Sequence, residues 1–252
     1  MNPVNHTRST CQPTHLLHTP DTFVRIALPG LTRGLAIIHA APALGANFLQ
    51  YTAELEPGGT LAPAPHQRFL YVLEGHGLIS LDAENYAEGH PLTHPLHPRF
   101  FAYLPPAEPA TITANTHLKL AVIEKAYEPL PGVPPPAAIF SQEDQIPTLP
   151  LNDDPNLLVR SLLPTTFDFD FAVNTMTYAP GAALPQVEVH VMEHGCLMLQ
   201  GHGPYRLGDH TYLAQAGDFI WMAPFCPQWF QSEGPLDARY LIYKNWNRIP
   251  AL

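Results

Sequence analysis

Positive charge is scarce in this sequence. It has 12 Lys and Arg residues against 22 Asp and Glu, and charged residues of both signs make up only 13% of its 252 residues. The formal net charge of −10 argues against electrostatic binding to nucleic acid or to an anionic membrane surface. We therefore expect small solutes, or other proteins, as partners.

Long apolar runs and cysteine frameworks are also missing. No apolar run approaches the ~20 residues of a membrane span, and the first twenty residues lack the apolar core of a signal peptide, so we expect a cytoplasmic location. The three cysteines, Cys11, Cys196 and Cys226, are an odd and scattered set. They indicate neither a disulfide framework nor a cysteine-based zinc motif.

Uninterrupted helical periodicity is the third absence. Thirty prolines and sixteen glycines, spread along the whole chain, divide it into segments of about 5–8 residues, which is typical of strands in a sandwich or barrel. With 46% hydrophobic residues the chain can still bury a substantial core. The sequence therefore predicts an all-β protein.

A pattern in the first half of the chain recurs in the second half, about 120 residues later. The echoes are Glu56-Pro57-Gly58 with Ala179-Pro180-Gly181, Leu70–Gly77 with Cys196–Gly203, and Ile123-Glu124-Lys125 with Ile242-Tyr243-Lys244. A period this long indicates two similar β-domains in tandem rather than a solenoid. We expect an N-terminal arm over residues 1–20, domains over 21–128 and 157–252, and a Pro-rich connector over 129–156.

The stretch from Glu188 to His194 sets three possible metal ligands in seven residues. On a strand, Glu188 and His190 would face one side and the intervening valines the other. With His194 they would form a two-His-one-carboxylate arrangement, which divalent Fe, Mn and similar ions accept while keeping positions open for substrate. A polar strand face open to water is the alternative interpretation of Glu188 and His190.

The surroundings of this stretch resemble a known superfamily. Its landmarks are Gly181, Glu188-x-His190-x-x-x-His194, Gly201, Gly217-Asp218, Pro224 and Gln228. In this order they resemble the two short motifs of the cupins, with Glu188 in place of the first His, His194 in place of the usual Glu, and Gln228 in place of the last His. That ligand set, with the segments 205–209, 215–225 and 239–248, resembles the (S)-ureidoglycine aminohydrolases, a family of manganese-dependent bicupins of purine (allantoin) degradation. The resemblance is close over residues 165–250 and looser from Thr19 to Glu128.

The resemblance implies a bicupin, with two tandem small β-barrels of the double-stranded β-helix or jelly-roll type. It implies one Mn²⁺ per chain in the C-terminal barrel, held by Glu188, His190, His194 and Gln228. It implies that Tyr205, Tyr240 and Lys244 hold the substrate. We also expect Glu188 to contact the substrate and, like Lys244, to have a catalytic role, because a carboxylate that coordinates through one oxygen keeps the other free to act as a base. The activity would be hydrolysis of (S)-ureidoglycine to (S)-ureidoglycolate and ammonia.

The first domain carries Ala62, Ala64 and Arg68 at the matching positions, so we expect its barrel to lack a metal site. Barrels of this kind often present sheet edges to a neighbouring chain, and a homo-oligomer is expected.

Other interpretations of the site remain open. The ligand types alone would also permit Fe(II), Co(II), Ni(II) or Zn(II). A bicupin with such ligands could be an Fe or Mn dioxygenase or decarboxylase of a small organic acid. It could also be a metal-bearing module that binds a ligand without turnover.

Overall fold

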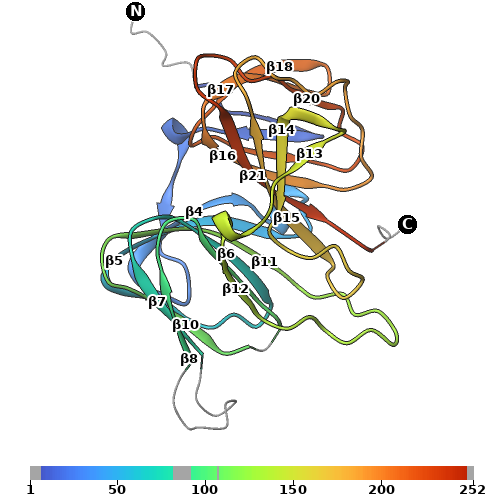
Figure 1. Ribbon diagram of the computed structural model, residues 1–252. Coiled ribbons are helices and arrows are strands. Elements are labelled where there is room, and N and C mark those ends of the chain that lie inside the picture. The colour runs from blue at the N-terminus through green and yellow to red at the C-terminus, as the bar shows by residue number, and fades with distance from the viewer. Residues whose placement is uncertain (1–6, 82–91, 107, 249–252) are drawn as a thin grey trace, which may run out of the picture. The chain divides into compact units, whose positions relative to one another are not determined.

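β-strands form nearly all the regular structure of the chain in this computed structural model, which describes residues 7–81, 92–106 and 108–248 (Figure 1). Within these ranges the only helices are three 3-10 segments of three residues each, Pro20–Thr22, Pro42–Leu44 and Glu143–Gln145. The all-β prediction is confirmed. Proline and glycine are frequent along the chain and disfavour helix, and the long stretch without either, residues 110–128, forms strands and not a helix.

The chain divides into two compact units. The N-terminal unit is Val24–Gln145, and the C-terminal unit is Ile146–Leu252 together with Met1–Phe23. Each unit has its own hydrophobic core, one around Leu70, Val72 and Val122, the other around Cys196, Ile220 and Tyr240.

The N-terminal unit is built on a ten-stranded antiparallel sheet. Its path runs β12-β9-β6-β11-β5-β10-β7-β8, and β4 joins β3 to the sheet through β5. The strands are β3 (Arg25–Ile26), β4 (Leu31–Ala40), β5 (Leu49–Leu61), β6 (Gln67–Glu74), β7 (Gly77–Leu81), β8 (Leu92–Leu96), β9 (Phe100–Leu104), β10 (Ala110–Ala114), β11 (Leu118–Lys125) and β12 (Ile139–Gln142).

Strand β10 shows how the sequence selects this structure. Ala110, Ile112 and Ala114 are buried, while Thr111 and Thr113 are half-buried on the other face. Successive side chains of a strand point to opposite faces, so this alternation places one face in the core and leaves the other nearer to water.

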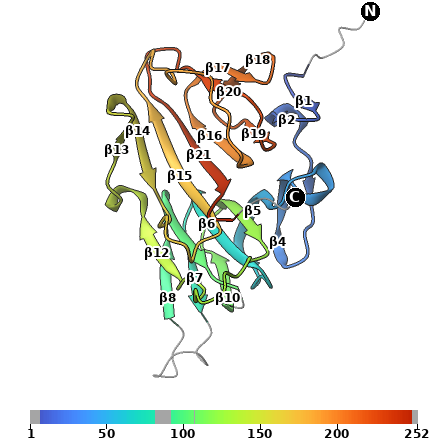
Figure 2. The ribbon, with the colours of Figure 1, turned by 90° about the vertical axis from the view of Figure 1, so that its right-hand side faces the viewer.

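The C-terminal unit contains an eight-stranded and a three-stranded sheet (Figure 2). The orders are β1-β2-β19-β16-β21-β15-β14-β13 and β18-β17-β20. The strands are β1 (Thr10–Gln12), β2 (His15–His18), β13 (Leu149–Leu151), β14 (Asp154–Ser161), β15 (Phe171–Tyr178), β16 (His194–Gln200), β17 (His202–Leu207), β18 (His210–Gln215), β19 (Phe219–Met222), β20 (Gln228–Phe230) and β21 (Ala238–Asn245).

The repeat seen in the sequence reappears at two glycine turns. Gly75 follows β6 and Gly201 follows β16, and both have positive φ, 85° and 73°. A Cβ on Gly75 would lie 1.8 Å from the backbone O of His117, and one on Gly201 would lie 2.7 Å from the Cα of Ala238. Only glycine fits where each turn passes the start of the next central strand, β11 or β21.

Residues 10–18 fall within the segment expected to be a polar arm, but they form β1 and β2. Leu16 and Leu17 of β2 pair with Trp221 and Ile220 of β19, and Leu17 belongs to the core of the C-terminal unit. Four residues carry too little pattern for their partner, 200 residues away in sequence, to be recognised. The first six residues of the expected arm lie outside the described ones.

The expected connector, residues 129–156, is shared between the two units. Its β12 pairs with β9 in the N-terminal unit, and its β13 pairs with β14 in the C-terminal unit. Residues 126–138, between β11 and β12, form no strand. Pro150 lies in β13, the last strand of its sheet, where a missing N–H is tolerated.

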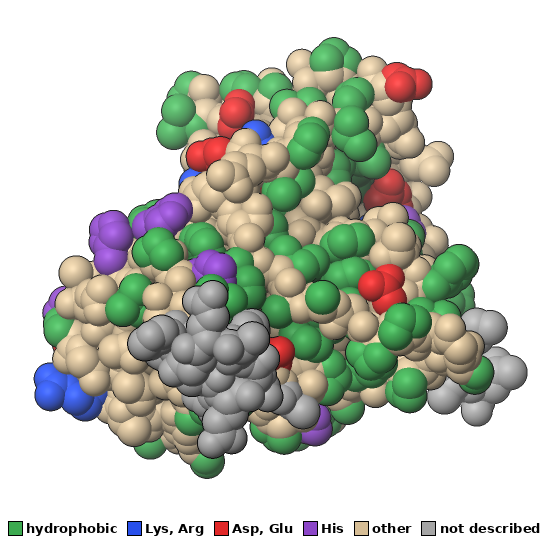
Figure 3. Space-filling model, turned by 60° about the horizontal axis from the view of Figure 1, so that its bottom comes forward, with side chains coloured by type: hydrophobic (Ala, Val, Ile, Leu, Met, Phe, Trp, Pro, Cys, Tyr) green, Lys and Arg blue, Asp and Glu red, His purple; other side chains and the backbone are tan. Residues whose placement is uncertain are grey.

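The surface carries few charges. Figure 3 shows a face on which hydrophobic and uncharged side chains predominate and charged ones are scattered. Within the described ranges, no helix has the length and apolar character that a membrane span requires.

Candidate active site

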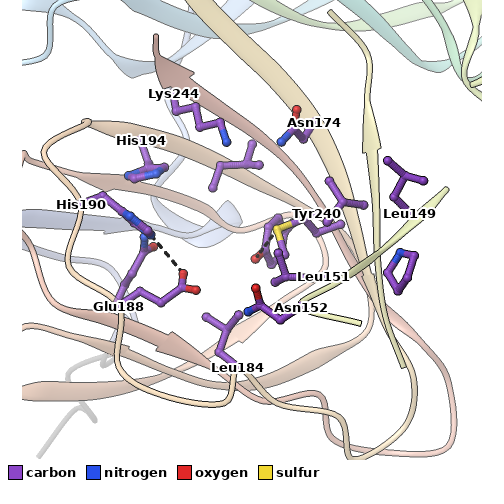
Figure 4. A pocket seen from close by; sticks show the side chains of 15 residues that line it. Leu149, Leu151, Asn152, Asn174, Leu184, Glu188, His190, His194, Tyr240 and Lys244 are labelled. Carbon is purple, nitrogen blue, oxygen red and sulfur yellow. Dashed lines mark hydrogen bonds and ion pairs between the residues drawn. The ribbon is translucent and has the colours of Figure 1, made fainter. Parts of the chain in front are cut away.

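A cavity of about 350 Å³ lies in the C-terminal unit (Figure 4). Its walls come from the β13–β14 hairpin, from β15 and β21, and from the segment that joins β15 to β16. Six of the seven side chains proposed from the sequence line it, namely Glu188, His190, His194, Gln228, Tyr240 and Lys244.

The segment with Glu188 and His190 is not the strand that the alternating pattern predicted. Only an isolated bridge forms there, in which Glu188 N donates to Gln228 O (2.8 Å) and Gln228 N donates to Glu188 O (2.9 Å). The alternation nevertheless sorts the side chains, since Glu188 and His190 line the cavity while Val187, Val189 and Val191 are exposed. The bridge brings the first and fourth expected ligands together.

Glu188 and His190 are already in contact. The Oε2 atom of Glu188 lies 3.1 Å from Nε2 of His190, and about a quarter to a third of each side chain is exposed. The other carboxylate oxygen, Oε1, makes no hydrogen bond within the described residues. It is thus available to a ligand or to a proton.

His194 is the first residue of β16 and is buried beside the two other basic groups of the cavity. Its ring centroid is 5.3 Å from that of His190, and in the sheet register it lies opposite Lys244. Burial lowers the pKa of His194 to about 3, and the positive charges of His190 and Lys244 act in the same direction. The imidazole is therefore neutral, which is the form that binds metals.

Gln228 is buried at the start of β20, and its side chain is held by Tyr205. The Tyr205 hydroxyl donates to Gln228 Oε1 at 3.3 Å and also lies 3.9 Å from the Met222 sulfur. Tyr205 itself is fully buried and does not line the cavity. The structure thus places it behind an expected metal ligand.

Tyr240 and Lys244 both project from β21 into the cavity. The Tyr240 hydroxyl bonds to the Tyr178 hydroxyl (2.8 Å), and burial raises its pKa, so it stays protonated. Lys244 makes no ion pair within the described part of the chain. Burial lowers its pKa, an effect that the charge of Glu188 partly offsets. Its Nζ lies 4.7 Å from the centroid of the Trp246 ring, a cation–π contact that leaves its N–H donors available. A partly desolvated ammonium group without an ion-pair partner is a natural binding point for a carboxylate.

These donors suit a divalent cation in kind, as one carboxylate, two imidazoles and an amide oxygen. The 3.1 Å between Glu188 and His190 also matches the ~3.0 Å that separates neighbouring ligands around an ion with bonds of ~2.1 Å. Within residues 7–81, 92–106 and 108–248, however, no three His, Cys, Asp or Glu side chains converge closely enough to hold an ion. In this arrangement Glu188 binds His190 directly.

Two polar residues of the cavity, Asn152 and Asn174, were missed in the sequence. Asn152 and Asp153 form the turn between β13 and β14, with positive φ at both residues, 51° and 62°. An Asn-Asp pair between strands is a hairpin signal, but it fell inside the expected connector. Asn174 lies at the centre of β15, between Val173 and Thr175.

The N-terminal unit carries an ion pair at the corresponding place. Arg68 faces Glu124 across β6 and β11, as His194 faces Lys244 across β16 and β21. The buried guanidinium of Arg68 lies 2.8 Å from the Glu124 carboxylate and donates to the backbone O of Ala62. Tyr51 donates to the same carboxylate at 2.9 Å. These groups satisfy one another and leave no free donor set for an ion.

Comparison with known proteins gives three curated relatives over almost the whole chain, two of which are more than 30% identical to it. A probable (S)-ureidoglycine aminohydrolase of rice (Oryza sativa subsp. japonica) is 37% identical over 250 residues, covering 98% of this chain and 77% of the rice protein. The (S)-ureidoglycine aminohydrolase of Arabidopsis thaliana is 36% identical over 248 residues, covering 97% and 80%. No protein-family model matches the chain.

Among solved structures, a putative glyoxylate induced protein from Pseudomonas aeruginosa superposes with a TM-score of 0.87 at 29% identity, covering 100% of this chain and 95% of that one. Oxalate decarboxylase, a cupin, superposes with a TM-score of 0.71 at 13% identity, covering 96% and 80%. The second likeness concerns the fold alone. It confirms the cupin architecture expected from the sequence motifs.

Proposed function

The chain belongs to the (S)-ureidoglycine aminohydrolase family, and we propose that it hydrolyses (S)-ureidoglycine to (S)-ureidoglycolate and ammonia in the cavity of its C-terminal unit. The observation that carries this placement is the convergence of Glu188, His190, His194 and Lys244 on one cavity. The substrate has a carboxylate, an amine and a ureido group on one carbon. It needs an anion-binding group and a proton-transfer group, roles that Lys244 and Glu188 of the cavity would fill.

We propose that Glu188, His190, His194 and Gln228 hold a divalent ion, with Mn²⁺ as the expected occupant. When bound, such an ion would polarise substrate heteroatoms and hold the substrate in one orientation. The support is the chemistry of the donor set, the neutral state of His194, and the Glu188–His190 spacing.

Lys244 would bind the substrate carboxylate. Its ammonium group has no carboxylate partner within the described residues, lines the cavity, and is partly removed from water, which strengthens its attraction for an anion. Tyr240 would present its hydroxyl from the same strand, held in place by Tyr178. Together these two side chains would orient the reacting carbon.

Glu188 would transfer the proton during the hydrolysis. A water molecule supplies a hydroxyl group to the substrate carbon, the bond from that carbon to the amine breaks, and ammonia leaves with the proton that the water gave up. Oε2 of Glu188 contacts His190, so Oε1 remains to take the proton from water and to return it to the amine.

Tyr205 would act through Gln228, because its hydroxyl donates to that amide oxygen and does not reach the cavity. We expect it to orient the amide oxygen towards the ion, as outer hydrogen bonds commonly do for metal ligands. The contact between Tyr205 and substrate that the family resemblance implied stays an open prediction.

The direct test is ammonia release from freshly generated (S)-ureidoglycine by purified protein, before and after chelation and again after Mn²⁺ is added back. We expect release that chelation abolishes and Mn²⁺ restores, and Mn²⁺ should be detected by metal analysis. His194→Ala should lose both the metal and the activity. His202→Ala, a matched exposed histidine on β17, should lose neither.

Three other outcomes would contradict the proposal. Full activity after exhaustive removal of divalent ions would reject the metal site. Oxygen consumption or CO2 release with small organic acids, without ammonia release, would indicate a dioxygenase or decarboxylase. Tight ligand binding with no product would indicate a binding module.

A homo-oligomer remains the expected assembly, since strand edges such as β13 and β8 end their sheets in the single chain. Light scattering during gel filtration would measure the mass in solution, and a mass of 27.8 kDa would mean a monomer.

A further inference from the structure

Asn174 is a buried polar side chain on the inner face of β15. Across the sheet, Ala172, Asn174 and Met176 lie opposite Lys244, Ile242 and Tyr240 of β21, so their side chains share one face. Asn174 and Met176 line the cavity with all three of those β21 residues (Figure 4). Only 8% of Asn174 is exposed.

The Oδ1 atom of Asn174 is buried and has no hydrogen-bond partner within the described residues. Leaving such an acceptor unsatisfied costs about 1–3 kcal/mol, and most buried polar atoms in native proteins have a partner. The side chain does not support the fold through any hydrogen bond, yet it lies in the wall of the cavity. An amide group in the wall of a cavity with no partner in the protein is available to bond a ligand there.

Asn174 lies near the two functional groups that β21 contributes. In Figure 4 its side chain and that of Lys244 extend towards each other at one end of the cavity, and Glu188 and His190 lie across from it. A ligand whose carboxylate binds Lys244 would therefore bring its neighbouring group within reach of Asn174.

We propose that Asn174 recognises the ureido group of the substrate while Lys244 holds its carboxylate, an inference that rests on the proposed function. A carboxamide offers an acceptor and two donors. A ureido group offers N–H donors and a carbonyl acceptor, so the two can pair in a complementary way. Asn174 acts here as a specificity residue. It discriminates a ureido acid from a simple hydroxy acid, because an unpaired buried amide penalises a ligand without that group.

The test is Asn174→Leu, which keeps the approximate shape and removes every polar atom. Because the wild-type amide has no bond to lose, the variant should melt at the same temperature or higher. The KM for (S)-ureidoglycine should rise about 10- to 100-fold, with kcat falling much less. Ser232→Ala is the matched control. Its Oγ is also buried without a partner but does not line the cavity, so KM should not change.

A binding measurement separates this inference from the proposed activity. By calorimetry, wild-type protein should bind (S)-ureidoglycolate more tightly than glycolate, which lacks the ureido group. Asn174→Leu should remove that preference and leave glycolate binding unchanged. Asn174→Ser is the second variant if the leucine is not accommodated, and the same loss of preference is expected of it.

Two results would overturn the assignment. Lower thermal stability with unchanged KM and unchanged ligand preference would make Asn174 a structural residue. Retention of the preference for ureidoglycolate in both variants would mean that another group recognises the ureido moiety. If wild-type protein released no ammonia, the proposed function would fail, and the calorimetric comparison would still decide the role of Asn174.

Discussion

The hydroxyl groups of Tyr178 and Tyr240 lie 2.8 Å apart in the buried interior of the C-terminal unit. Tyr240 lines the cavity, whereas Tyr178 lies behind it on β15 and does not reach the cavity. Tyr178 is therefore a positioning residue for a group that we expect to contact substrate. Tyr240 also lies 3.2 Å from the Met176 sulfur, a weaker partner.

Replacing Tyr178 with Phe should reduce kcat/KM about three- to tenfold, because Tyr240 loses the bond that orients its hydroxyl. The free energy of unfolding should fall by about 1 kcal/mol. Tyr212→Phe is the control, since it loses a comparable 2.9 Å bond to His15 away from the cavity. This control change should lower the free energy of unfolding and leave kcat/KM unchanged. Equal kinetic effects of the two changes would refute the positioning role.

Tyr205→Phe should weaken Mn²⁺ binding about tenfold, as loss of an outer hydrogen bond to a metal ligand commonly does. The KM for substrate at saturating Mn²⁺ should stay near the wild-type value, because Tyr205 does not line the cavity. A metal titration at constant substrate measures the first quantity. A large rise in KM with unchanged metal affinity would instead restore the substrate contact that the family resemblance implied.

Lys244 should make substrate binding sensitive to alkaline pH. Burial lowers its pKa below the ordinary 10.5, so the ammonium is lost at a lower pH than in an exposed lysine. KM should then begin to rise at a lower pH than the one at which an exposed lysine titrates, because the neutral amine no longer attracts a carboxylate. Lys244→Met should raise KM about 10- to 100-fold at all pH values. Lys244→Arg should remove the alkaline rise, because a guanidinium stays charged. If the KM of the Lys244→Arg variant rose with pH in the same way, a group other than Lys244 would be responsible for the rise.

Gly75→Ala should destabilise the N-terminal unit by about 3 kcal/mol or more, because a Cβ would overlap the backbone O of His117. Gly58 also has positive φ, 76°, but a Cβ there meets nothing within 4 Å. Gly58→Ala should therefore cost only about 1 kcal/mol. Denaturant unfolding of the two variants measures the difference. Similar losses would show that backbone strain alone matters at Gly75.

The sequence by itself determined the class of the fold and the chemical type of the site. Frequent prolines and glycines favour short strands over long helices, and the repeated turn at Gly75 and Gly201 shows two related halves, because these are local effects of each residue on its own backbone. The donor types at Glu188, His190 and His194 also depend only on the residues present. Residues 187–191 do not form the predicted strand. The alternation nevertheless separated correctly the side chains that line the cavity, Glu188 and His190, from the exposed valines.

Tertiary structure alone decided which distant segments meet. The backbone hydrogen bonds that pair Glu188 with Gln228, or β2 with β19, can be made by almost any residue. The identity of a side chain therefore does not show which distant segment it will pair with. The burial of Tyr205 behind Gln228, the hairpin wall at Asn152 and the unpartnered amide of Asn174 all follow from such long-range pairing. Whether a polar side chain faces water, a neighbour or a cavity depends on what packs against it, and only the folded chain specifies that.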